Sequence, residues 1–260
     1  MTIELRDTAR LPADWKAKPD CLRDRVALIV GAAGALGSAS AKAAAQAGAK
    51  VILLGRKVRP LEKLYDEIEA AHPGAASIYP LDLAGASPKD YGDLAATIER
   101  EFGRLDGIVF AAAHFEGLQP MLDATPEAWL KTLHVNLNAP FLIVQACAEA
   151  LLRAPADDAN ASVVFVLDDP ARVGKAFWGA YGVAKHALLG LASILHQEWD
   201  STRARVHTLL PAPMRSALRR TAYFGENTME LPTADGAAQA VVYLLGDEGA
   251  AVRDKALDLR

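Results

Sequence analysis

Residues 26–37 read VALIVGAAGALG, an apolar run followed at once by a glycine-rich turn. An Ala-rich segment continues from the turn and stops at Gly48, which predicts a buried strand, a tight turn and a helix over 35–48. In an open parallel sheet, the turn after the first strand sets a pyrophosphate against the amino terminus of the helix. A glycine turn also serves close packing of a helix on a strand, but its place after the first strand favours a nucleotide site.

The alternation of apolar runs and amphipathic segments repeats along the chain. Further strands are expected at 51–55, 77–81, 107–113, 162–167, 205–210 and within 252–259, and further helices at 58–71, 88–102, 125–153, 177–199 and 233–246. Continuous apolar strands between such helices predict a parallel sheet that is covered on both faces. We therefore expect one Rossmann-like α/β domain, 23–260, with a doubly wound parallel sheet of about seven strands. Residues 1–22 are expected to form an arm and 214–232 a loop-rich segment.

Composition and charge exclude several classes of function. The net charge of -4 and the pI of about 5.9 argue against nucleic acid as a partner. Cys21 and Cys147 are unclustered and the six histidines lack HExxH spacing, so neither a disulfide framework nor a metal site is expected. The first twenty residues lack the apolar core of a signal peptide, and no stretch approaches the roughly 20 apolar residues that cross a bilayer. A cytoplasmic protein without a membrane partner is expected.

Tyr181 and Lys185 form a Tyr-x-x-x-Lys pair within the helix predicted at 177–199. Side chains four residues apart lie one above the other on a helix, so the ammonium of Lys185 is expected to lower the pKa of the Tyr181 phenol. A tyrosine with a lowered pKa can exchange a proton with a carbonyl or an alcohol. The alternative is that the spacing arises by chance on a surface helix.

Together these features resemble the short-chain dehydrogenase/reductase family over residues 24–250. The family motif TGxxxGxG falls on Val30, Gly31, Ala35 and Gly37, so its first and last glycines match and its threonine and middle glycine do not. Ala35 puts a methyl group where backbone approaches phosphate, and Gly34 is expected to absorb part of that strain.

The resemblance implies a nicotinamide cofactor. Arg56 follows the strand 51–55, where members specific for NAD carry an acidic residue, and a guanidinium can pair with the 2′-phosphate of NADP. NADP(H) is therefore expected over NAD(H), with an ordinary exposed arginine as the alternative. The expected cofactor-binding residues are Gly31, Gly34, Ala35, Leu36, Gly37, Arg56, Asp82, Leu83, Ala112, Tyr181, Lys185, Pro211, Met214 and Ser216.

The resemblance also implies a catalytic set, with one departure. Tyr181 takes the acid/base role, Lys185 lowers its pKa, and Asn136 holds a water next to the lysine. The family serine that donates a hydrogen bond to the substrate carbonyl lies about thirteen residues before the tyrosine, where this chain has Asp168. An ionised aspartate cannot donate, and its charge opposes the developing oxyanion. Three interpretations of Asp168 stay open: a protonated donor, a partner for a substrate cation, or a turn residue in a site that no longer works.

Two functions remain possible at this point. The first is an NADP(H)-dependent oxidoreductase that interconverts a carbonyl and an alcohol, with Tyr181 as general acid/base. The second is a catalytically impaired member of the same family that binds cofactor or acts as an oligomer partner. The helices at 134–153 and 177–199 resemble those that pair across two-fold axes in the family, so a homodimer or homotetramer is expected, or a hetero-oligomer with a related active chain.

Overall fold

The computed structural model describes residues 7–153, 160–253 and 255–260. Its centre is an eight-stranded sheet in the order β1-β8-β7-β6-β5-β2-β3-β4, with every neighbouring pair parallel. The strands are Thr8–Ala9 (β1), Val26–Val30 (β2), Lys50–Gly55 (β3), Ala76–Pro80 (β4), Gly107–Phe110 (β5), Ala161–Val166 (β6), Ala204–Leu210 (β7) and Ala256–Asp258 (β8). The predicted doubly wound parallel sheet is confirmed. Its extra strand, β1, comes from the segment expected to be an arm.

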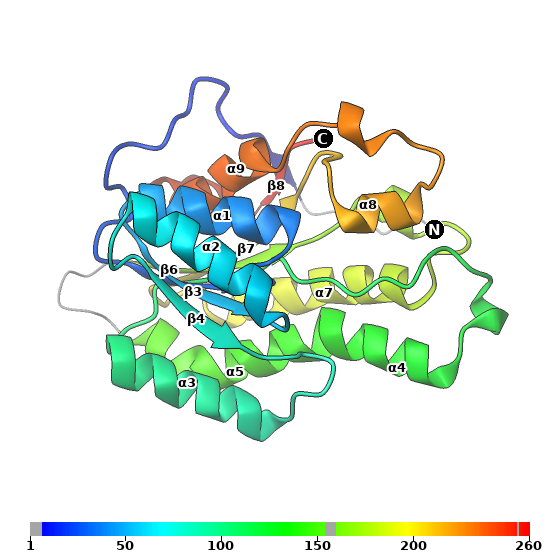
Figure 1. Cartoon of the computed structure of the whole chain (residues 1–260), viewed down its shortest axis with the longest axis horizontal. Helices are drawn as coiled ribbons and strands as arrows, with labels where there is room; N and C mark the ends of the chain where they lie inside the picture. Colours follow the sequence, from blue (N-terminus) through cyan, green and yellow to red (C-terminus); the bar gives the residue numbers. More distant parts are fainter. Residues whose placement is uncertain (1–6, 154–159, 254) are drawn as a thin grey trace.

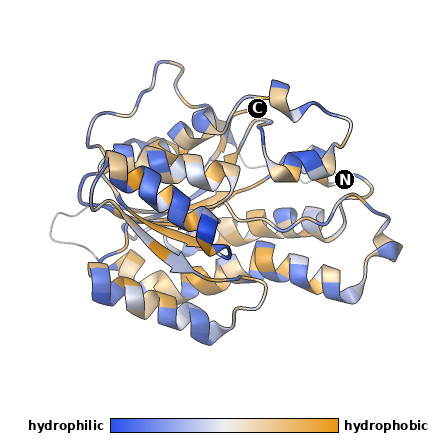
Figure 2. Cartoon of the chain, viewed as in Figure 1, coloured by the Kyte–Doolittle hydropathy of each residue, from blue (hydrophilic) through white to orange (hydrophobic). Residues whose placement is uncertain are grey.

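Helices cover both faces of the sheet (Figure 1). One face carries α1 (Ala35–Gln46), α2 (Val58–Ala71) and α9 (Asp235–Leu245), and the other carries α3 (Pro88–Phe102), α5 (Ala139–Leu152) and α7 (Gly179–Glu198). Residues of β2 alternate between the two cores: Val26, Leu28 and Val30 pack with α3, α5 and α7, whereas Ala27 and Ile29 pack with the opposite helices. Because both sides of a strand are buried, the strands are continuous apolar runs, and Figure 2 shows them mostly apolar.

Local signals fix some helix boundaries. Helix α3 occupies the predicted range 88–102 because Ser87 and Asp90 form a capping box at its start and Gly103, with φ of 67°, ends it. The helix predicted at 125–153 is instead three elements: α4 (Pro126–Leu133), the π-helical turn η2 (His134–Asn138) and α5. The remaining elements are α6 (Pro170–Val173), α8 (Ala217–Ala222) and the 3-10 turns η1 (Met121–Asp123), η3 (Thr228–Glu230) and η4 (Asp247–Val252).

One helical stretch among the described residues, 126–152, is long and apolar enough to cross a membrane by length and composition alone. It is formed by α4, η2 and α5. Ile143, Val144 and Leu151 of this stretch are buried in the core that α5 shares with α3 and α7. The core helix of a globular domain passes the same test, so this stretch is weak evidence for a membrane span.

The order of the strands places a ligand site between β2 and β5. The chain leaves β2 toward β3 and β4 on one side and returns to β5 on the other side of β2. The connections after β2 and β5 therefore diverge at the carboxyl ends of these two strands. A crevice at such a topological switch point is where open α/β sheets bind their ligands.

Candidate active site

A cavity of about 610 Å³ lies at this carboxyl edge of the sheet. It is lined from several elements: the turn after β2, the ends of β3, β5 and β6, helix α7, and the segment that follows β7. Most of the residues predicted from the sequence line it together, namely Gly31, Gly34, Ala35, Leu36, Arg56, Asp82, Leu83, Ala112, Asp168, Tyr181, Lys185, Pro211, Met214 and Ser216. Gly37 and Asn136 are not among the lining residues.

The turn after β2 requires glycine at its first position. Gly31 has a φ of 86°, and a Cβ there would lie 2.5 Å from the backbone nitrogen of Ala112. The N–H groups of Gly31 and Ala32 donate to the carbonyl oxygen of Leu54 at 2.9 and 3.0 Å. These contacts hold the turn against β3 and direct the chain into α1.

Helix α1 presents an uncapped amino terminus to the cavity. Its N-cap, Gly34, has no side chain to bond the first N–H groups, and its first turn contains no acidic residue. Ala35 and Leu36 of that turn line the cavity. Unpaired N–H groups and the positive end of a 12-residue helix fit a pyrophosphate, so the residues present suit a dinucleotide.

One prediction about the glycine motif is corrected. Gly37 does not line the cavity: a Cβ there would lie 2.2 Å from the carbonyl oxygen of Gly31, so this glycine allows α1 to pack closely on the turn. Gly34 has a φ of -81°, a conformation open to any residue, and its part in relieving strain at Ala35 stays a prediction. Ala35 itself is exposed at the start of α1.

The adenosine half of the predicted site lies at the ends of β3 and β4. Arg56 and Lys57 follow β3 directly, are exposed and line the cavity. Asp82 accepts a hydrogen bond from the backbone N–H of Ala84 at 3.1 Å, which makes it a turn residue as well as a lining one. Two cationic side chains beside one another can bind a phosphate group.

The segment after β7 covers part of the cavity. Pro211, Met214 and Ser216 line it as predicted, and Ser216 also caps α8 by accepting from the Arg219 N–H at 3.1 Å. Arg219 in turn pairs with both carboxylate oxygens of Glu226, at 2.6 and 2.7 Å. These contacts give the predicted loop-rich segment a helix and an internal ion pair.

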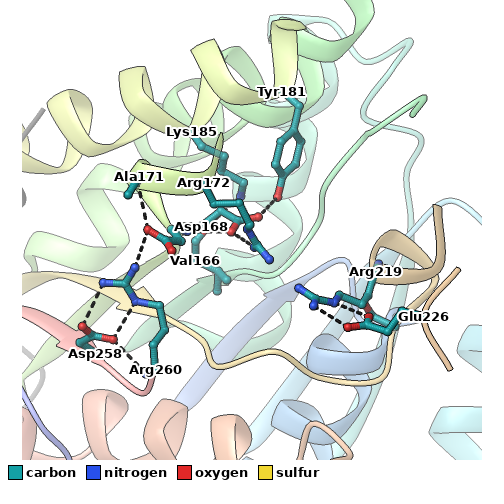
Figure 3. A network of polar contacts seen from close by, with 12 residues as sticks. Val166, Asp168, Ala171, Arg172, Tyr181, Lys185, Arg219, Glu226, Asp258 and Arg260 are labelled. Atoms are coloured by element: carbon teal, nitrogen blue, oxygen red, sulfur yellow. Dashed lines mark hydrogen bonds and ion pairs between the residues drawn. The ribbon is translucent and has the colours of Figure 1, made fainter. Parts of the chain in front are cut away.

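Tyr181 and Lys185 lie one turn apart on the buried side of α7 (Figure 3). The Tyr181 hydroxyl donates to Oδ2 of Asp168 at 2.9 Å. The Lys185 ammonium donates to the carbonyl oxygen of Val166 at 2.7 Å and lies 5.7 Å from the centroid of the Tyr181 ring. The predicted pair is therefore present. The Tyr181 hydroxyl is bonded to Asp168, just after β6, and the Lys185 ammonium is bonded to Val166, the last residue of β6.

The predicted lowering of the Tyr181 pKa is wrong for this arrangement. Burial, followed by the charge of Asp168 and its hydrogen bond, raises the pKa of Tyr181 well above its ordinary value. The cation that acts in the opposite direction is Arg172, not Lys185. Burial lowers the pKa of Lys185 to about 8, against the influence of Asp168.

Asn136 does not reach Lys185 with its side chain. It lies in the π-helical turn η2, where its Oδ1 accepts from the His114 N–H and its Nδ2 donates to the His114 carbonyl oxygen, both at 2.8 Å. The amide thus fixes the loop that follows β5. The side chain therefore has a positioning contact, and the function of holding a water beside the lysine stays a prediction. Periodicity could not reveal this contact, because a π turn sits inside an otherwise continuous helix.

Sequence reasoning missed Arg172, which lies one turn after Asp168. The guanidinium forms an ion pair with Oδ1 of Asp168, and the backbone N–H of Asp169 donates to the same oxygen at 2.7 Å. Asp168 therefore accepts hydrogen bonds from three donors, the third being Tyr181. It has a cation within the chain, in place of the substrate cation or the donor role considered from the sequence. The i, i+4 spacing was the available signal.

Asp169, the next residue, also fixes this part of the chain. Its side chain caps α6 by accepting from the Ala171 N–H at 3.0 Å, and it pairs with Arg260 at 2.6 Å. Arg260 also binds Asp258 of β8 at 3.0 Å (Figure 3). The segment that carries Asp168 and α6 is thereby tied to β8. Among the residues described, no group of three or more histidine, cysteine or acidic side chains is arranged to hold a metal ion.

Known proteins resemble this chain in sequence and fold. A family model described as short chain dehydrogenase matches residues 25–226. The oxidoreductase YciK of Escherichia coli K12 is 32% identical over 234 residues, covering 90% of this chain and 91% of YciK. A solved structure named as a short chain dehydrogenase of Pseudomonas syringae is 35% identical with a TM-score of 0.89, over 95% of this chain and 99% of its own. Another from Shigella flexneri, complexed with NADP, is 31% identical with a TM-score of 0.85, over 93% and 99%. The chain therefore belongs to the short chain dehydrogenase family of oxidoreductases.

Proposed function

We propose that the chain interconverts a carbonyl compound and an alcohol with NADP(H), with Tyr181 as the general acid/base. The observation that carries the proposal is that one cavity, of about 610 Å³, brings the uncapped start of α1 and Arg56 together with Tyr181 and Lys185. NADPH, when bound, supplies the hydride. The chain's own groups position the two reactants and transfer the proton.

The preference for NADP(H) is supported by charge. Arg56 and Lys57 lie at the end of β3, and neither residue is the acidic partner that a free ribose would need. The relative from Shigella flexneri that is complexed with NADP has the same fold at 31% identity. A guanidinium beside the 2′-phosphate forms charge-assisted hydrogen bonds that NADH cannot form.

The proton chemistry favours reduction. The raised pKa keeps Tyr181 protonated at neutral pH, which is the form that gives a proton to a carbonyl oxygen. Lys185, with a pKa of about 8, is mostly charged at neutral pH and stabilises negative charge that develops nearby. Both side chains are buried, so bulk water screens these interactions weakly.

Cofactor titration tests the proposal. We expect NADPH to bind the wild-type chain, and Arg56→Ser to raise the NADPH dissociation constant by roughly 10- to 100-fold while changing the NADH constant little, because a hydrogen bond to a charged group contributes roughly 1.5–3 kcal/mol. Arg59→Ser is the matched control, since Arg59 is exposed three residues later and does not line the cavity. Fluorescence or calorimetry measures both constants. Failure to bind millimolar NADPH would refute the proposal.

The hydrogen bond from Tyr181 to Asp168 favours a second candidate function. In that case the phenol is retained by a carboxylate, and the chain binds cofactor or pairs with a related chain without turnover. NADPH binding with no reduction across a panel of aldehydes and ketones would support it.

We also propose, from the family, a cytoplasmic homodimer or homotetramer. Exposed apolar residues on α5 and α7, such as Phe141 and Ile194, are consistent with pairing of these helices between two chains. Light scattering tests the oligomeric state.

A further inference from the structure

We propose that Arg172 supplies the hydrogen-bond donor to the substrate carbonyl oxygen in place of the family serine, and that Asp168 holds Arg172 in position for this task. The proposal rests on the carbonyl chemistry proposed above. It explains how the site can work although the family serine is replaced. Asp168, at the serine position, is an acceptor, so the substrate carbonyl oxygen lacks this donor unless another side chain provides one.

The geometry places Arg172 beside the phenol. Tyr181 donates to Oδ2 of Asp168, while Arg172 pairs with Oδ1 of the same carboxylate. Figure 3 shows the hydroxyl and the guanidinium converging on Asp168 from α7 and α6. An oxygen atom that approaches the Tyr181 hydroxyl therefore comes within reach of the guanidinium of Arg172, as it would of a serine hydroxyl at this end of β6.

Arg172 presents donors to the cavity. Its side chain lines the cavity and is 27% exposed. A guanidinium has five N–H donors in a fixed plane, and the ion pair with Asp168 does not occupy all of them. The exposed N–H groups of the guanidinium are therefore the ones that can donate to a carbonyl oxygen of a substrate.

Aromatic rings limit the positions that this guanidinium can take. Its central carbon lies 5.5 Å from the centroid of the Trp178 ring and 5.9 Å from that of Tyr223. Trp178 also stacks on Phe115, with centroids 5.3 Å apart, so its ring is itself fixed. Donors that are held in place before reaction cost little reorganisation when charge develops on the substrate oxygen.

Arg172 also affects the pKa of the Tyr181 phenol. Its charge lowers the pKa of Tyr181 against burial and Asp168, and it therefore stabilises the phenolate left after proton transfer. Burial disfavours the charged guanidinium, but Asp168 and Tyr223 outweigh burial and raise the pKa of Arg172, which stays charged at working pH. The ammonium of Lys185 donates to the Val166 carbonyl oxygen and is not among the groups that shift the pKa of Tyr181 in this arrangement.

The test compares Arg172→Ala in an Asp168→Asn background. Asparagine keeps an oxygen that accepts from Arg172 but carries no charge, so removing the arginine there leaves no unpaired carboxylate. We expect kcat for the fastest carbonyl substrate of the panel to fall about 100-fold between D168N and D168N/R172A, with KM changed less, because the lost donor acts in the transition state. Added guanidinium chloride at millimolar concentration should restore part of kcat to the double variant.

Two controls accompany this comparison. D168N/R220A removes an exposed arginine that does not line the cavity and should match D168N. The NADPH dissociation constant and the thermal midpoint of each variant show that it folds and binds cofactor. Equal kcat in D168N and D168N/R172A would overturn the proposal and leave Arg172 as a neutralising partner of Asp168. A wild-type chain that binds NADPH but reduces no carbonyl in the panel would instead overturn the proposed function, and the assignment of Arg172 with it.

Discussion

Replacing Lys185 with methionine should stabilise the fold. The ammonium is buried on α7, and burial lowers its pKa from 10.5 to about 8. The unfolded chain therefore binds this proton more tightly than the folded chain. The cost to folding is complete below about pH 8 and fades as the pH rises toward 10.5. At 1.36 kcal/mol for each pKa unit, it amounts to about 3 kcal/mol at pH 7.

Part of this gain is lost with the hydrogen bond to Val166. Methionine cannot donate to that carbonyl oxygen, which forfeits about 1 kcal/mol. The free energy of unfolding of Lys185→Met should thus exceed that of the wild type by about 2 kcal/mol at pH 7, with a midpoint roughly 4–8 °C higher. At pH 10 the remaining burial cost is below about 1 kcal/mol and the advantage should vanish.

Urea unfolding followed by circular dichroism at pH 7 and pH 10 measures this difference. Lys131→Met is the control, because Lys131 lines the same cavity with a side chain that is 41% exposed, and its stability should change by less than about 0.5 kcal/mol. A Lys185→Met chain that is less stable than the wild type at pH 7, or an advantage that does not depend on pH, would refute the reasoning. Such a buried lysine would then be kept for function without a measurable cost in stability.

Gly31→Ala should destabilise the fold by more than Gly74→Ala in urea unfolding: both glycines have positive φ, costing about 1–2 kcal/mol, but only at position 31 would the new Cβ meet backbone, 2.5 Å from Ala112. Equal losses would show that Ala112 moves aside freely. His207→Leu should reduce acid sensitivity, because burial, followed by the charge of Arg205, lowers the pKa of His207 to about 3, and the unfolded chain binds that proton from about pH 6.5 downward. The wild type should lose about 3 kcal/mol from this residue between pH 7.5 and pH 4.5, and His72→Leu, at a partly exposed site, should keep that loss.

Structural features that depend only on residues close together in the sequence were predictable. The strands follow from continuous apolar runs, and α3 follows from Ser87, Asp90 and Gly103 at its ends. The two-residue strand β1 was not predictable, because its residues carry no apolar run and it forms only by pairing with β8 at the sheet edge. The π turn around Asn136 was missed for a related reason, since it interrupts a helix without changing its apolar pattern.

The glycine turn, Arg56 and the pair on α7 lie in short sequence motifs. The amino-acid sequence alone therefore indicates the family and the positions of these residues. The chemistry of the pair was decided by folding. The end of β6 brings Asp168 against Tyr181 from thirteen residues away, and α6 adds Arg172 to the same carboxylate. A pKa depends on burial and on charges a few ångströms distant through space, whereas sequence spacing fixes distance only within one helix or strand. Hence the place of Tyr181 one helical turn before Lys185 was predictable from the sequence, but its raised pKa and its arginine neighbour depend on the tertiary structure.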